Sequence, residues 1–70
     1  MPQVIEILDN AIIGIHKCDS NGKAIELFKI IIKETIQGAD QWPDEDFASV
    51  VDEGFILLDG GNGSICLNME

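Results

Sequence analysis

The residue types best suited to metal binding are one histidine and two cysteines, His16, Cys18 and Cys66. His16 and Cys18 lie two positions apart, which suggests a ligand pair with Cys66 as a possible third ligand. On a helix, residues two apart point roughly 200° apart around the axis and cannot reach one ion. We therefore expect a solvated histidine, a buried cysteine and no metal site. A strand would place both side chains on one face and reopen the question.

Two glycine-containing segments have the beginnings of calcium loops but lack the ligands. When Gly22 is aligned with the glycine of an EF-hand loop, Lys17 and Phe28 occupy the first and last ligand positions. The segment 60–63 begins like a calcium-binding β-roll repeat, yet Ile65 stands at the aspartate position and no second copy follows. Both segments are therefore predicted to be turns.

The chain has no arrangement typical of an enzyme. The carboxylates of Asp44, Glu45 and Asp46 match the first turn of a helix better than an acid/base pair, which needs a pocket and a perturbing neighbour. The serines share one histidine, and no nucleotide-binding or nucleophile motif is present. We expect neither enzymatic activity nor a cofactor.

The composition predicts one small folded domain. The chain has 70 residues, 46% hydrophobic and 24% charged, and a core of this size supplies only ~3–5 kcal/mol unless a bridge, a metal or another chain adds to it. Two cysteines are too few for a disulfide framework. No secretory signal and no apolar run near ~18 residues is present, so we expect a cytoplasmic protein without membrane contact. Abundant isoleucine and the absence of arginine suggest an AT-rich bacterial or phage genome.

The net charge of -9 is concentrated in the second half of the chain. The last basic residue is Lys33, and every charged residue after it is acidic. Such a surface repels nucleic acid and attracts basic protein surfaces. The residues predicted to bind a basic partner are Asp40, Trp42, Asp44, Glu45, Asp46, Asp52 and Glu53. Trp42 and Phe47 are candidate anchors, with core packing as the alternative for each.

Apolar spacing predicts the first elements. Residues 3–18 place apolar side chains three, four and seven apart, which predicts a helix, although isoleucine also favours a strand over 11–15. Turn-forming residues at 19–22 can also cap a following helix. Residues 23–37 then form the clearest amphipathic helix, which Gly38 is suited to end.

The second half predicts a short helix and a hairpin. Pro43 and three acidic residues suit the start of a helix that ends at Glu53, before Gly54. Strands at 55–58 and 64–68 flank a glycine-rich turn. The predicted fold is α+β: a helical hairpin, a short third helix and a C-terminal β-hairpin. This order resembles a winged helix in topology, but a third helix with acidic residues and no basic one does not suit DNA binding.

Alternation along the hairpin predicts a second binding surface. If Phe55, Leu57, Ile65 and Leu67 face the helices, an apolar set is left on the other side. That set, predicted to mediate self-association in a homodimer, is Ile56, Leu58 and Cys66.

From the acidic second half of the chain, we predict an inhibitor-, immunity- or antitoxin-type protein that masks a basic surface of a target. The alternatives are a self-associating subunit and a small-ligand or metal module that uses Cys18 and Cys66.

Overall fold

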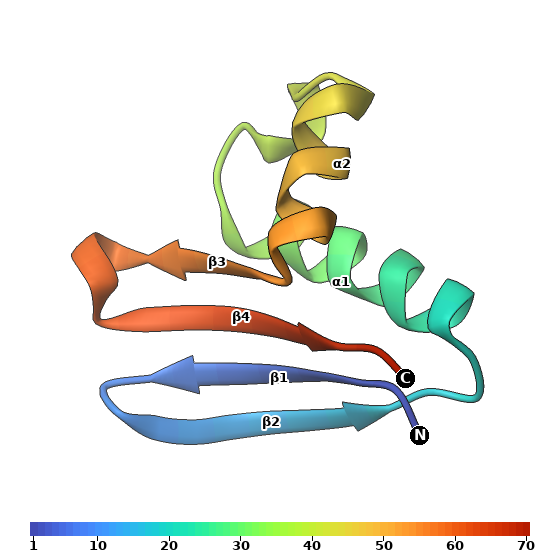
Figure 1. Ribbon diagram of the computed structural model, residues 1–70. Helices are drawn as coiled ribbons and strands as arrows, with labels where there is room; N and C mark the ends of the chain where they lie inside the picture. Colours follow the sequence, from blue (N-terminus) through green and yellow to red (C-terminus); the bar gives the residue numbers. More distant parts are fainter.

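Two β-hairpins, one from each end of the chain, join in one sheet in the computed structural model, which describes residues 1–70. The elements are β1 (Gln3–Leu8), β2 (Ala11–Lys17), α1 (Asn21–Thr35), the 3-10 turn η1 (Ala39–Gln41), α2 (Asp44–Glu53), β3 (Phe55–Leu58), the 3-10 turn η2 (Asp59–Gly61) and β4 (Gly63–Asn68). The 4-stranded sheet has the order β2-β1-β4-β3, and each neighbouring pair is antiparallel (Figure 1). The first and last strands of the chain are therefore the two central ones.

The N-terminal segment is a β-hairpin, so the helix predicted over residues 3–18 is wrong. The helical hairpin and the winged-helix topology are wrong with it, because β1 pairs with β4 instead of packing on the sheet as a helix. The α+β class holds. The strand alternative considered for residues 11–15 matches β2, which runs from Ala11 to Lys17.

A two-residue turn accounts for this hairpin. Leu8 pairs with Ala11, and the two residues between them, Asp9 and Asn10, have φ of 52° and 65°. Positive φ at both central residues defines the turn type that matches the twist of a hairpin, and Asp and Asn tolerate this conformation better than most residues. Asp9 N–H also donates to the Asn62 carbonyl at 2.8 Å, which links the tips of the two hairpins.

The remaining predicted elements are confirmed. The helix predicted over 23–37 is α1, which begins two residues earlier and ends two residues earlier. Ser20 caps it, since its Oγ accepts a hydrogen bond from Lys23 N–H at 3.2 Å. The predicted third helix is α2, and Gly54, with φ of 84°, ends it. The C-terminal hairpin is formed by β3 and β4.

The two faces of the sheet have different surroundings. Residues directly opposite on antiparallel strands share a face, so the pairs Val4–Leu67 and Ile56–Ile65 assign these side chains to the face that the helices cover. The pairs Ile5–Ile15, Ile5–Cys66, Phe55–Cys66 and Ile7–Ile12, with Leu57 two residues after Phe55, lie on the other face. We call this second set the open face: Ile5, Ile7, Ile12, Ile15, Phe55, Leu57 and Cys66.

The orientation predicted for β3 is reversed. Ile56 and Leu58 are half-buried and pack against the core, whereas Phe55 and Leu57 are exposed on the open face with Cys66. The cause is the strand register, which pairs Ile56 with Ile65. Because side chains alternate with a period of two, an error of one residue in the assumed register exchanges the two faces.

The core lies between the helices and one face of the sheet. α1 contributes side chains three and four residues apart, with Phe28 and Ile32 fully buried, and α2 contributes Phe47. Val4, Ile65 and Leu67 complete it from β1 and β4. Only 11 of 70 residues are buried. The core is therefore small, as expected for a chain of this length.

Hydrogen bonds fasten the C-terminus to the start of α1. Asn21 Nδ2 donates to the Glu70 carbonyl at 2.9 Å, and Glu70 N–H donates to Asn21 Oδ1 at 3.0 Å. The N-terminal ammonium of Met1 also forms an ion pair with the Glu70 side chain. The two chain ends accordingly lie side by side (Figure 1). None of the helices has the length and apolar character needed to cross a membrane.

Replacing Asn10 by glycine is expected to leave the melting temperature unchanged or to raise it. Glycine adopts a φ of 65° without a steric penalty, whereas glycine inside a helix costs about 1 kcal/mol relative to alanine. The matched control is Glu26→Gly at an exposed position of α1, which should cost about 0.5 kcal/mol and lower the melting temperature by roughly 2–4 °C. Thermal unfolding followed by circular dichroism measures both. An equal loss in both variants would contradict the hairpin.

Candidate protein-binding surface

The carboxylates around α2 are exposed and lack intramolecular partners. We call this set the acidic surface: Asp40, Asp44, Glu45, Asp46, Asp52 and Glu53. All of them are exposed, and none takes part in an ion pair. The ion pairs of the protein lie elsewhere and join Met1 to Glu70, His16 to Glu6, and Lys23 to Asp19.

The lysine that packs on α2 does not neutralise this charge. Lys33 Nζ lies 5.3 Å from the centre of the Phe47 ring, a distance typical of a cation–π contact. Its ammonium is thus held over an aromatic face and not beside a carboxylate. The carboxylates of the acidic surface thus form no ion pair with Lys33 and stay available to an external partner.

The helix dipole explains the carboxylates at only one end of α2. Asp44, Glu45 and Asp46 occupy the first turn of α2, where negative charge meets the positive end of the helix dipole. Asp52 and Glu53 occupy the last turn, where the same dipole disfavours them, and no basic residue is present there. The helix dipole therefore does not account for the two carboxylates at the C-terminal end of α2.

The two candidate aromatic anchors are largely used by the fold. Phe47 is 4% exposed and belongs to the core. Trp42 is half-buried, and its ring centre lies 5.5 Å from that of Phe47. Core packing therefore explains Phe47, while Trp42 packs against the core with part of its surface exposed, in the segment that joins η1 to α2.

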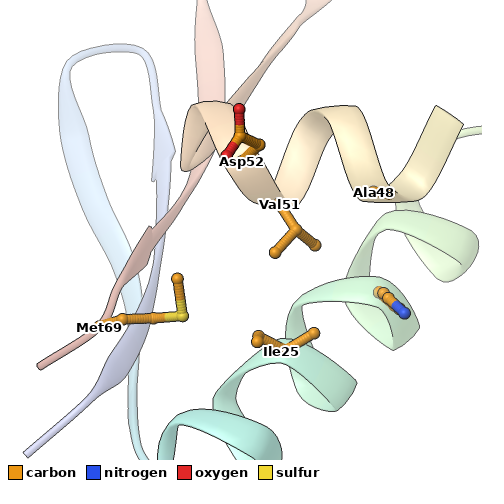
Figure 2. A pocket seen from close by; sticks show the side chains of 6 residues that line it. Ile25, Ala48, Val51, Asp52 and Met69 are labelled. Atoms are coloured by element: carbon orange, nitrogen blue, oxygen red, sulfur yellow. The ribbon is translucent and has the colours of Figure 1, made fainter. Parts of the chain in front are cut away.

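A groove between α1 and α2 adjoins the acidic surface. It has a volume of about 350 Å³, and its apolar lining comes from Ile25 on α1, Ala48 and Val51 on α2, and Met69 after β4 (Figure 2). Lys29 and Asp52 add one charge of each sign. The groove is large enough for an apolar side chain of a partner, and Asp52 belongs both to the groove and to the acidic surface.

The candidate metal ligands do not converge. His16 Nε2 lies 2.8 Å from Glu6 Oε2, at hydrogen-bond distance. Gly14 makes room for this pair, since a Cβ there would lie 2.9 Å from Glu6 Oε2. Cys66 lies on the open face, whereas Cys18 packs against the core. Both cysteines are free, and no group of three or more His, Cys, Asp or Glu side chains is placed to hold a metal ion.

The open face is a second surface, which sequence reasoning found only in part. Ile12, Ile15, Phe55 and Leu57 are 60%, 53%, 44% and 62% exposed, and no helix covers them. Of the residues predicted for self-association, only Cys66 lies here; Ile56 and Leu58 lie on the opposite face. Asp9-Asn10 between two runs rich in β-branched residues was the signal that could have revealed β1 and β2.

Comparison with models of protein families, with curated proteins and with solved structures finds no match.

Neutralising the last turn of α2 is expected to stabilise the fold. The double replacement Asp52→Asn and Glu53→Gln removes charges that the helix dipole disfavours, each by about 0.3–1 kcal/mol. The matched control, Asp44→Asn with Glu45→Gln, removes favourable charges and should lower the melting temperature. Melting curves at one fixed protein concentration measure both. A lower melting temperature in the first variant would show that these carboxylates serve the fold.

Proposed function

We propose that the chain is a small protein-binding module without enzymatic activity, which masks a basic surface of a protein target, as inhibitors, immunity proteins and antitoxins do. The observation that carries this proposal is the acidic surface, exposed and without ion pairs, beside an apolar groove. A basic target would supply the missing counterions.

The charge distribution suits long-range attraction. Unpaired carboxylates that share one surface raise the rate of encounter with a basic partner and give little affinity to acidic or neutral ones. Asp52 and Glu53 support the proposal most directly, since they remain where the helix dipole disfavours them. Binding to a target would offset the folding stability that these two carboxylates cost.

The groove adds a short-range contact to this attraction. Exposed charge pairs contribute little affinity by themselves, whereas an apolar side chain seated in a pocket is typical of a binding hot spot. Val51 and Met69 offer that contact next to Asp52. We therefore expect the target segment to combine an apolar side chain with neighbouring lysine or arginine residues.

The test is affinity capture from the native host with three immobilised proteins: the wild type, Asp52→Asn with Glu53→Gln, and Asp9→Asn with Asp59→Asn. The last pair removes the same charge from the hairpin tips, which lie at the end of the sheet away from the helices (Figure 1). The target should bind the wild type and the tip variant at ~50 mM salt, and bind the α2 variant about tenfold more weakly.

Binding to the wild type should also weaken steeply as salt rises, because exposed charges are screened. Titrating the captured protein into the wild type at several salt concentrations measures this dependence, and the emission of Trp42, the only tryptophan, reports contact near α2. Equal binding by all three proteins, or binding that salt does not change, would rule out the acidic surface as the docking site.

A further inference from the structure

The open face is a largely apolar surface that extends across all four strands, with Ser64 between Ile7 and Leu57 and with polar Gln3, Lys17 and Asn68 at one end of the same side of the sheet. Ile12 and Ile15 lie on β2, Ile5 and Ile7 on β1, Cys66 on β4, and Phe55 and Leu57 on β3. Antiparallel sheets commonly have one face in water, but that face is then polar. An apolar face of this kind typically marks a surface that another molecule covers.

We propose that two copies of the chain pack their open faces together, so that the sheets of both form the centre of a four-layer homodimer. The proposal involves a surface other than the acidic surface and does not depend on the proposed target. It differs from the self-association predicted from the sequence, because Phe55, Leu57 and the isoleucines of β1 and β2 replace Ile56 and Leu58.

The distribution of charge favours a second copy as the occupant. Glu6 and Lys17 are the only strand residues that carry a full charge at neutral pH, and Glu6 lies on the helix-covered side with Ile65. The acidic surface is on the helices, so two copies joined through their sheets keep these surfaces apart by more than the Debye length of ~8 Å. Two copies of a chain with a net charge of -9 can therefore associate through this face without strong repulsion.

The ends of the face are also complementary in charge. Lys17 lies at one end of β2, and Asp9 precedes its other end. A two-fold axis in the plane of the interface and perpendicular to the strands would place Lys17 of one copy near Asp9 of the other. The same operation places β2 over β2 and keeps the strands of the two sheets nearly aligned, as in sandwiches.

The exposed area suits a weak, reversible dimer. A large apolar side chain buries on the order of 150–200 Å² when fully covered, so the four exposed side chains given above leave roughly 330–440 Å² on each open face. Two copies would bury roughly 660–880 Å² from these residues, with a further contribution from half-buried Ile5, Ile7 and Cys66, which is the size of weak and transient interfaces. We expect a dimer that dissociates on dilution.

Light scattering between ~1 and ~100 µM tests the proposal with the wild type, Ile15→Lys, Leu57→Lys and Ile30→Lys. Ile15 and Ile30 are 53% and 50% exposed, and each replacement changes the net charge equally, but Ile30 lies on α1. Wild type and I30K should dimerise. I15K and L57K should remain folded by circular dichroism and dimerise at least tenfold more weakly, since a buried lysine would be unpaired.

Comparing I15K with L57K also distinguishes face-to-face packing from edge-to-edge strand pairing. Ile15 is on the edge strand β2, whereas Leu57 is on β3, the other edge, roughly 14 Å away across three strand spacings. A dimer joined edge to edge through β2 would survive L57K. That outcome, a strictly monomeric wild type, or equal dimerisation of all four proteins would each overturn the proposal.

The thiol of Cys66 gives a measurement that leaves the face intact. In a Cys18→Ser background, Cys66 is the only thiol, and it lies on β4 at the middle of the open face. Its reaction rate with a thiol reagent in excess should fall several-fold as the protein concentration passes from the monomeric to the dimeric range. An unchanged rate in a protein that dimerises over this range would exclude face-to-face packing.

Discussion

The pairing of β1 with β4 is the interaction on which the rest of the structure depends. It joins Gln3 to Asn68, almost the full length of the chain apart, and unites two hairpins that would each be marginal alone. Closing so long a loop has an entropic cost, which is offset only by the contacts that form when the central strands pair. We therefore regard the hairpins and helices as local units that the central pair assembles, and both chain ends as essential to the sheet.

This central pairing also separates the chemistry of the molecule into two sides. Val4 and Leu67, opposite each other on β1 and β4, receive the helices, while Ile5 and Cys66, the next pair along, face away from them. Negative charge collects on α2, outside the helical layer, and apolar surface collects on the open face. The two surfaces can thus act independently, since a partner bound at one leaves the other free.

The sequence was sufficient for the elements whose signals are local. Ser20 and the amphipathic pattern after it predicted α1, and Gly54 predicted the end of α2.

The N-terminal hairpin was missed because β1 carries apolar residues on both faces: Val4 on one, Ile5 and Ile7 on the other. A strand of this kind lacks the alternation of a half-buried strand, and its apolar residues also fit helical spacing. The orientation of Ile56 depended on a strand register that no local pattern fixes. The acidic surface was predictable, because charge and exposure follow from residue type, whereas the groove beside it depends on the packing of α1 against α2.

The small core and the open face can be understood together. A core built from 9 buried residues gives a limited margin of stability, and Asp52 and Glu53 reduce it further at the end of α2. Covering the open face adds apolar burial that the single chain cannot provide, and any molecule that binds only the folded state stabilises it by mass action. If two copies pair as proposed, folding and association are coupled: the chain would gain stability as its concentration rises, and a replacement on the open face would weaken both. In the proposed homodimer, the exposed isoleucines of β2, which would be an aggregation hazard on an isolated edge strand, would instead contribute to the stability of the small domain.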